Sequence, residues 1–317
     1  MANRLPLIAI VVVCSAFGWV VAADSRPVSP KDKTPVFSAL AGNEFSFDTG
    51  VLRGKLRAGG KSSGLSSVVH VPTGAKLDGG AGIVGFYRVF TANKRYGSAA
   101  WDWPSEATLL PDGAVEAIWP ATAERPFEMT AVYRWRDAST LDIETRATAK
   151  QDLSGFEVFL ASYFDKTLAS PYMYLRKGGS QSPELLLGTK TLGDWLMAAR
   201  DERAVAVIHD GRWKIEPNPV DWVIQRWMAA PLAVRRDAAG GVTAVVMAPL
   251  EDCIAVAMPY EGETHYSLYL SLFGRDVKSG ETAKASSRLV IAQKVSDQDV
   301  VGLYARYMLD LKGGCCN

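Results

Sequence analysis

The stretch that decides the fold reads FEMTAVYRWRDASTLDIETRATA, residues 127–149. Apolar and polar residues alternate through both halves, which is the period of a half-buried β-strand. The polar turn Asp137–Ser139 separates the halves. The stretch therefore predicts an antiparallel hairpin in which Arg134 lies opposite Asp142, a favourable cross-strand pair.

The same alternation recurs on both sides of this hairpin. The predicted strands are Phe45–Asp48, Val51–Arg57, Leu65–Val71, Phe156–Asp165, Gly241–Ala248, Cys253–Pro259, Tyr266–Phe273 and Lys284–Ala292. The dipeptide at 210–211, Asp-Gly, suits a type I′ turn and predicts another hairpin over residues 204–215. Helical spacing between Ser296 and Gly313 predicts one helix, with Asp299 completing its start signal. The pattern predicts an all-β fold, a large antiparallel β-sandwich with a short C-terminal helix.

The two ends of the chain carry separate signals. Met1–Ala23 combines one cation, a short apolar stretch and a small-residue end, which is the layout of a signal peptide cleaved near Ala23. We therefore expect a secreted or periplasmic protein; the alternative is an uncleaved anchor, although the apolar stretch is shorter than the ~20 residues of a membrane span. No integral span is expected after cleavage. Residues 24–42 predict an extended linker, 43–295 the sandwich, and 296–317 the helix with a Gly/Cys tail.

Composition narrows the class of protein. The 317 residues are 48% hydrophobic and carry 35 Lys+Arg against 34 Asp+Glu, which is typical of a globular chain and argues against nucleic-acid binding. Three dispersed histidines lack zinc-binding spacing, so no metal and no cofactor is predicted. Cys253 predicts a buried apolar side chain, and the sequence leaves open the redox state of Cys253, Cys315 and Cys316.

Three groups of segments carry a resemblance to a known family. They are Phe47–Gly54 with Gly64–His70, Tyr133–Ala149 with Phe156–Phe164, and Leu268–Glu281. Together they resemble the galactose mutarotase-like superfamily of sugar-active and carbohydrate-binding proteins. The resemblance implies the large β-sandwich known as a supersandwich, and a carbohydrate-related ligand. It implies no catalytic residue, because the histidines and glutamate that mutarotases use are not matched at His70, His209 or His265.

The richest candidate for a binding site is residues 86–106, where aromatic rings, guanidinium groups and carboxylates alternate. Sugars require aromatic faces and a few fixed polar groups. The predicted binding residues are Tyr87, Arg88, Arg95, Trp101, Trp103 and Glu106, with Asp165 and Tyr163 as further anchors. In an extended segment Trp101 and Trp103 would face the same way, and either arginine is suited to a sugar carboxylate, so the predicted saccharide is neutral or acidic. The alternative is that the tryptophans fill the sandwich end and the arginines pair with Asp102 or Glu106.

Glu263 and His265 are the predicted acid–base pair, because a carboxylate that orients an imidazole supports proton transfer near neutral pH. Glu157 and Asp165 lie ~26 Å apart along an extended strand, too far for the paired carboxylates of a glycosidase.

Whether the protein is an enzyme stays open at this point. The first hypothesis is a carbohydrate-binding or carbohydrate-processing protein. The alternatives are a mutarotase-like epimerase that uses His265 and Glu263, a polysaccharide lyase in which Tyr163 abstracts a proton, and a non-catalytic envelope structural protein whose face packs against a partner.

Overall fold

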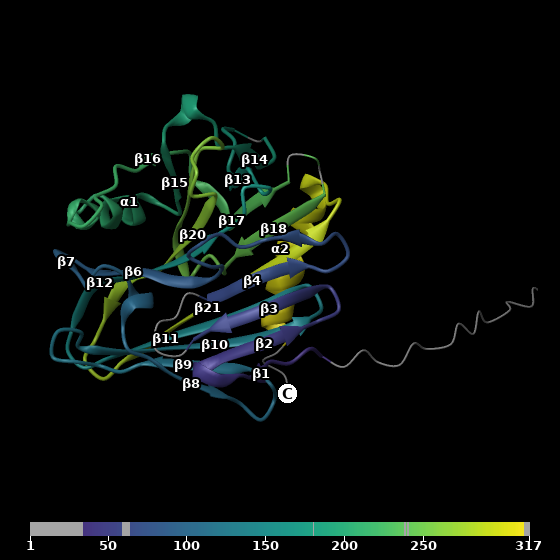
Figure 1. The fold of residues 1–317 in the computed structure, drawn as a ribbon. Coiled ribbons are helices and arrows are strands. Elements are labelled where there is room, and N and C mark those ends of the chain that lie inside the picture. The colour runs from purple at the N-terminus through teal and green to yellow at the C-terminus, as the bar shows by residue number, and fades with distance from the viewer. Residues whose placement is uncertain (1–33, 59–63, 180, 238, 240, 314–317) are drawn as a thin grey trace, which may run out of the picture. The chain divides into compact units, whose positions relative to one another are not determined.

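β-Strands in three sheets supply most of the regular structure (Figure 1). The computed structural model describes residues 34–58, 64–179, 181–237, 239 and 241–313. Neighbouring strands are antiparallel except β15 and β16, which are parallel. The all-β prediction and the sandwich are confirmed.

The sheets are given in the order in which their strands are hydrogen-bonded. The nine-stranded sheet runs β14 (Glu184–Leu187), β13 (Ser170–Leu175), β17 (Met228–Arg236), β18 (Val242–Met247), β21 (Thr282–Gln293), β11 (Thr140–Ala149), β10 (Phe127–Asp137), β9 (Val115–Trp119) and β8 (Glu106–Leu109). The seven-stranded sheet runs β16 (Val223–Ile224), β15 (Trp195–Ala199), β19 (Cys253–Pro259), β20 (Ser267–Val277), β12 (Leu153–Tyr163), β6 (Gly85–Thr91) and β7 (Lys94–Arg95). The five-stranded sheet runs β1 (Ser38–Ala39), β2 (Glu44–Asp48), β3 (Leu52–Arg57), β4 (Gly64–His70) and β5 (Ala75–Lys76).

The hairpin predicted from residues 127–149 is present as β10 and β11. Its register places Arg134 opposite Asp142, as predicted. The two side chains nevertheless do not form an ion pair with each other. Arg134 donates to Asp112 at 2.5 Å, and Asp142 accepts from Arg288 at 2.6 Å. The sequence pattern therefore predicts the cross-strand neighbours, whereas the ion pairs depend on the strands that flank the hairpin.

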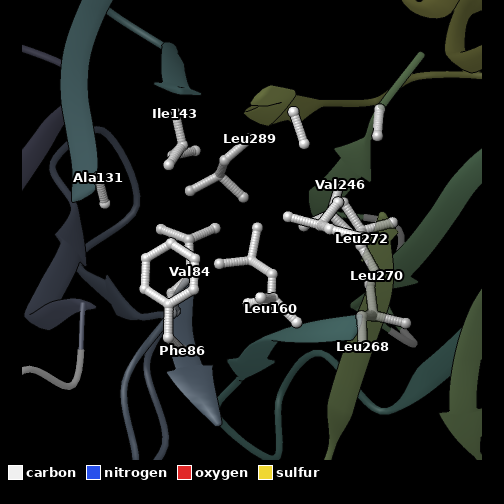
Figure 2. Close-up of a cluster of buried hydrophobic side chains, with 14 of the residues drawn as sticks. Val84, Phe86, Ala131, Ile143, Leu160, Val246, Leu268, Leu270, Leu272 and Leu289 are labelled. Atoms are coloured by element: carbon white, nitrogen blue, oxygen red, sulfur yellow. The ribbon is translucent and has the colours of Figure 1, made fainter. Parts of the chain in front are cut away.

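The main core lies between the nine-stranded and seven-stranded sheets. Figure 2 shows Ile143 and Leu289, from β11 and β21, across from Phe86 and Leu160 of the seven-stranded sheet. All four are at most 3% exposed. This apolar contact is the burial that stabilises stacked sheets.

The seven-stranded sheet is buried on both faces. On β12, the side chains of Phe156, Val158 and Leu160 enter the main core, whereas Phe159, Ala161 and Tyr163 enter a second cluster on the opposite face. A strand covered on both sides has few polar positions, which explains the long apolar run of this segment. The second cluster carries the candidate site.

Helix α2 (Asp297–Gly313) confirms the predicted C-terminal helix. Ser296 Oγ accepts from the backbone N–H of Asp299, and the Asp299 carboxylate accepts from the backbone N–H of Ser296, a reciprocal cap like the one the sequence predicts. Val300 and Tyr307 pack on the face of the nine-stranded sheet away from the main core. Among the described residues, no helix has both the length and the apolar character that a membrane crossing requires.

The hairpin predicted over residues 204–215 is wrong. Helix α1 (Glu202–Ile208) occupies its first half, because the Asp201 carboxylate accepts from the backbone N–H of Ala204 at 2.8 Å and caps the helix. Ala204 and Ile208, four residues apart, both pack into the second cluster. Gly211, at φ 99°, follows the helix instead of closing a hairpin.

Ordered packing begins earlier than the predicted linker boundary at residue 42. Phe37 is 2% exposed, and its ring centroid lies 5.8 Å from that of Phe47 and 5.9 Å from that of Trp135. The predicted signal peptide, the first part of the linker, and Cys315 and Cys316 lie outside the described residues. Cys253 is fully buried, as predicted.

Candidate functional site

A cavity of about 290 Å³ opens on the second face of the seven-stranded sheet. This is near the lower end of the ~300–1,000 Å³ typical of small-molecule sites. Its aromatic lining comprises Tyr87, Phe159, Tyr163, Trp195, Trp213, Trp222 and Tyr269, and its other lining residues are Arg88, Asn218, Pro219, Val220 and His265. Four strands supply the floor and side walls, and residues 213–222 supply the opposite wall. We call this space the aromatic cavity.

A β-bulge places two neighbouring side chains of β6 in the aromatic cavity. Val158 of β12 pairs with Val89, but Leu160 pairs with Phe86, so two residues of β6 oppose one residue of β12. Phe86 and Val89 both enter the main core, which leaves the two residues between them, Tyr87 and Arg88, on the cavity face. Bulges are common beside functional sites because they redirect side chains in this way.

Arg88 is buried in the aromatic cavity without a counter-ion. It is 3% exposed and makes no ion pair with any carboxylate in the described part of the chain. Its Nη2 donates to the backbone carbonyl of Asn218 at 2.6 Å, and its guanidinium lies 5.0 Å from the Trp213 ring. The Nε and Nη1 donors have no acceptor among the described residues. An uncompensated buried cation is costly, so it marks a place where an anion is favoured.

The indole N–H groups of Trp213 and Trp222 add two more such donors. Both side chains are at least nine-tenths buried, both line the aromatic cavity, and neither Nε1 has an acceptor within the described ranges. With Arg88 Nε and Nη1, residues of this one cavity carry four buried donors without a partner. Trp119 and Trp135 in the main core also carry indole N–H groups without an acceptor among the described residues, so such a group does not by itself indicate a ligand.

Arg95, the other arginine predicted to bind a carboxylate, holds backbone instead. Its guanidinium donates to the carbonyl oxygens of Gly97, Ser98, Ile215 and Pro217. Burial, followed by the neighbouring charge of Arg88, lowers the pKa of Arg95. Arg95 does not line the aromatic cavity, but it anchors the segment that forms the opposite wall. Arg95 therefore holds the backbone of residues 215–217 in position.

Trp101 and Trp103 face different clusters, contrary to the expectation that they point the same way. The segment is not extended there, because Ala100–Asp102 forms a 3₁₀ turn. Trp101 stacks on Tyr87 with ring centroids 4.6 Å apart and planes at 6°, behind the cavity lining. Trp103 belongs to the main core beside Phe127.

Glu106 and Asp165, the two predicted carboxylate anchors, lie outside the aromatic cavity. Glu106 is exposed at the start of β8, on the edge strand of the other large sheet. Asp165 follows the end of β12, accepts from the backbone N–H of Thr167 at 3.0 Å, and lines a neighbouring cavity.

The structure joins Glu263 and His265 directly. Glu263 Oε1 lies 2.6 Å from His265 Nδ1, and Glu263 Oε2 accepts from the backbone N–H of His265 at 2.8 Å. This is closer than an extended segment would allow, because the chain turns at 261–265. With Nδ1 engaged, Nε2 is the ring atom left for a ligand. His265 lines the aromatic cavity, and its ring centroid lies 6.3 Å from that of Tyr163.

Tyr163 and Tyr269 bring two phenol groups to the cavity. Ser267 Oγ donates to the Tyr269 hydroxyl at 2.7 Å, and the Tyr269 hydroxyl donates to that of Tyr163 at 3.5 Å. Burial raises the pKa of Tyr163 well above 10 and raises the pKa of Tyr269 to about 12. Both phenols are therefore protonated at neutral pH and act as hydrogen-bonding groups.

A buried ion pair joins Arg212, the residue before Trp213, to Glu157, and no pattern in the sequence predicts it. Arg212 Nη1 donates to Glu157 Oε2 at 2.9 Å, and Ser271 Oγ donates to Glu157 Oε1 at 2.6 Å. Asp210 accepts from the other side of the guanidinium. Burial raises the pKa of Glu157, and the charge of Arg212 opposes that rise. The network fixes Arg212 and so positions the adjacent Trp213.

Sequence reasoning therefore finds part of the lining and misses the rest. Tyr87, Arg88, Tyr163 and His265 line the same cavity. The missed residues are Phe159, Trp195, Trp213, Trp222 and Tyr269. The available signal was the density of tryptophan over residues 213–227. In the described ranges no three His, Cys, Asp or Glu side chains are gathered as a metal site would need.

Comparison with known proteins gives no match to a family model and none to a curated protein. Solved structures do match. A galactose mutarotase-like protein from Lactobacillus casei ATCC 334 is 10% identical, covers 78% of this chain and 100% of its own, and has a TM-score of 0.51. A galactose mutarotase related enzyme from Lactobacillus acidophilus is 10% identical over 80% of this chain and 99% of its own, with a TM-score of 0.47.

A heparan sulfate lyase from Pedobacter heparinus is 7% identical, covers 81% of this chain and 36% of its own, and has a TM-score of 0.46. At 10% identity, the likeness to the Lactobacillus casei protein shows the fold alone and leaves the activity open. The described chain therefore has the galactose mutarotase-like β-sandwich fold, as the resemblance in the sequence implies.

Proposed function

We propose that the protein binds a saccharide that carries a carboxylate, and that it does so in the aromatic cavity. The observation that carries this proposal is the buried guanidinium of Arg88, which has no counter-ion among the described residues and lines an aromatic-walled cavity. The C–H faces of a sugar ring pack on aromatic rings, and its hydroxyl and carboxylate oxygens accept hydrogen bonds. The likeness of the fold to galactose mutarotase-like proteins supports a sugar over other acidic ligands.

Arg88 is the residue that selects the charge of the ligand. Its planar guanidinium, which has no counter-ion among the described residues, matches the geometry of a carboxylate. A hydrogen bond to a charged group contributes ~1.5–3 kcal/mol, so Arg88→Met should weaken binding of an acidic sugar about 10- to 100-fold. Binding of the corresponding neutral sugar should change much less.

The test is titration calorimetry with glucuronate, galacturonate, glucose and galactose, after a glycan array has ranked acidic against neutral glycans. Arg275→Met is the matched control, because Arg275 is a half-exposed arginine that pairs with Glu281 at 2.8 Å. Thermal unfolding of each variant checks that the fold is kept. If Arg88→Met binds acidic sugars as the unchanged protein does, or if acidic and neutral sugars bind alike, the proposal is wrong. An array that retains no saccharide would favour the envelope structural alternative.

A second candidate function is acid–base processing of the bound sugar, as in a mutarotase-like epimerase. The observation that favours it is the 2.6 Å contact between Glu263 and His265 at the cavity. Here His265 Nε2 exchanges the proton, and Glu263 orients the ring through Nδ1. The protonated phenol of Tyr163 is suited to donating a hydrogen bond, which favours this role over proton abstraction by Tyr163 in a lyase.

The test of this candidate is the rate at which the α and β anomers of the sugar interconvert in the presence of the protein, measured by NMR exchange spectroscopy. His265→Gln should abolish the catalysed exchange while it preserves binding, because the amide keeps a polar group but cannot shuttle a proton. Formation of an unsaturated product from an acidic oligosaccharide would instead point to the lyase. Exchange that is unchanged in His265→Gln would exclude His265 as the acid–base residue.

We also propose that the protein acts outside the cytoplasm, in the periplasm or after secretion. The support is the layout of Met1–Ala23. N-terminal sequencing of the protein recovered from its native host should begin at Asp24. Recovery of the intact N-terminus from the cytoplasm would contradict this.

A further inference from the structure

A second cavity adjoins the aromatic cavity and shares two of its lining residues. It measures about 380 Å³, and Tyr163 and His265 line both spaces. The remaining walls come from the loop around Gly80, the end of β12 at Asp165 and the turn at Tyr266. We call this space the lysine cleft, because Lys76 and Lys166 also line it.

The lysines of the lysine cleft lack charged partners, whereas its aspartates accept hydrogen bonds from the backbone. Lys76 and Lys166 form no ion pair with any described residue. Two carboxylates also line the cleft, and both accept from backbone. Asp78, which is 6% exposed, accepts from the N–H groups of Ser67 and Val68 at 2.9 and 2.7 Å, and Asp165 accepts from the N–H of Thr167 at 3.0 Å. His265 therefore lines both a cavity that holds Arg88 and a cleft that holds two lysines without an ion pair among the described residues.

The floor of the lysine cleft is held by backbone contacts. The N–H of Gly79 donates to the carbonyl of Tyr163 at 2.8 Å, and the N–H of Asp165 donates to the carbonyl of Leu77 at 2.8 Å. A Cβ at Gly79 would lie 2.8 Å from the carbonyl oxygen of Phe164, so this position requires glycine. A Cβ at Gly80 would meet nothing within 4 Å. The loop is therefore fixed by Gly79, while Gly80 faces open space.

We infer that the lysine cleft is a second subsite, which takes the neighbouring unit of an acidic oligosaccharide. This inference rests on the proposed function of the aromatic cavity. A chain of sugar units carrying carboxylates or sulfates would place one unit beside Arg88 and the next beside Lys76 and Lys166. The junction between the two units would then lie at Tyr163 and His265, the residues common to both spaces. The ligand class is accordingly a charged glycan of two or more units.

Binding of size-graded ligands tests the inference. The acidic monomers are galacturonate and glucuronate, and the acidic trimers are trigalacturonate and a heparin trisaccharide. Maltotriose is the neutral trimer. Each probe is titrated into the full protein. We expect at least one acidic trimer to bind ~10-fold or more tightly than its monomer, with the gain reduced at high salt because exposed lysine contacts are screened. Maltotriose should show no such gain.

Two sets of variants assign the gain to the lysine cleft. Gly80→Phe should fill the open space and reduce trimer affinity to that of the monomer, while monomer affinity is unchanged. The double variant Lys76→Ala with Lys166→Ala should also reduce trimer affinity to that of the monomer, because it removes the two positive charges of the cleft. Gly178→Phe is the control, because Gly178 also has open space around a Cβ and does not line either cavity.

Equal affinity for monomer and trimer, or a gain that survives Gly80→Phe, would overturn the second subsite and leave the aromatic cavity proposal intact. Loss of monomer binding in Gly80→Phe with a normal fold would also overturn it, because the two subsites would not be separable. If no acidic sugar of any length binds, the proposed function itself fails, and the subsite with it.

Discussion

Removal of Arg212 should destabilise the protein strongly and in a pH-dependent way. Arg212 is 1% exposed, and it is the cation that pairs with Glu157, whose side chain is fully buried. Breaking a buried pair by removing one partner costs ~3–5 kcal/mol, because the remaining charge is left uncompensated. We therefore expect Arg212→Met to lower the free energy of unfolding by about that amount at pH 7.

The pH dependence follows from Glu157. Burial raises the pKa of this carboxyl above its ordinary 4.5, and Arg212 opposes that rise. Without Arg212 the pKa of Glu157 in the folded state rises further. A raised folded-state pKa contributes stability that is fully present below 4.5 and is lost as the pH rises through the folded value. The deficit of Arg212→Met against the unchanged protein should therefore be smaller at pH 5 than at pH 8.

Urea unfolding followed by tryptophan fluorescence measures both effects, since Trp213 is adjacent to Arg212. The double variant Glu157→Gln with Arg212→Met should recover part of the loss, because the amide is neutral. Arg275→Met, which breaks an exposed pair, should cost at most ~1 kcal/mol. A deficit below ~1 kcal/mol for Arg212→Met, or one that is equal at pH 5 and pH 8, would refute the reasoning.

Three further predictions concern the scaffold. Leu289→Ala should lower the free energy of unfolding by ~2–5 kcal/mol, since Leu289 is 1% exposed between the sheets; chemical denaturation measures it, and a loss under ~1 kcal/mol would contradict the packing. Ser296→Ala should cost ~1 kcal/mol by removing the cap of α2, and hydrogen exchange should rise first in that helix. Burial raises the pKa of Cys253 to about 12, so iodoacetamide at pH 8 should leave it unlabelled until urea unfolds the chain, as peptide mass spectrometry would show.

Local patterns in the sequence predict the parts of this fold that depend on neighbouring residues. The alternation over 127–149 predicts both strands and the register between Arg134 and Asp142. The cap residues Ser296 and Asp299 predict where α2 begins. In each case the physical cause lies within a few residues of the chain or across a single turn, so it can be read without the tertiary structure.

The helix at 202–208 shows where local signals compete. Asp210-Gly211 is a good hairpin turn, but Asp201 is also a good helix cap, and the sequence does not rank the two. The decision comes from burial: as a helix, the segment places Ala204 and Ile208 together against the second cluster. Tertiary packing of this kind overrides local preference.

What the sequence determined by itself is the sandwich, its terminal helix and the aromatic and cationic composition of one candidate segment. Only the tertiary structure decided which of those side chains meet. The bulge in β6 turned Tyr87 and Arg88 to one face, and Arg95 was used to hold the 215–217 backbone. Trp213, Trp222 and His265 reached the same cavity from distant parts of the chain. The physical reason is that strand period and capping are local, whereas a site forms from long-range pairing of strands and from the partners that buried donors find or lack.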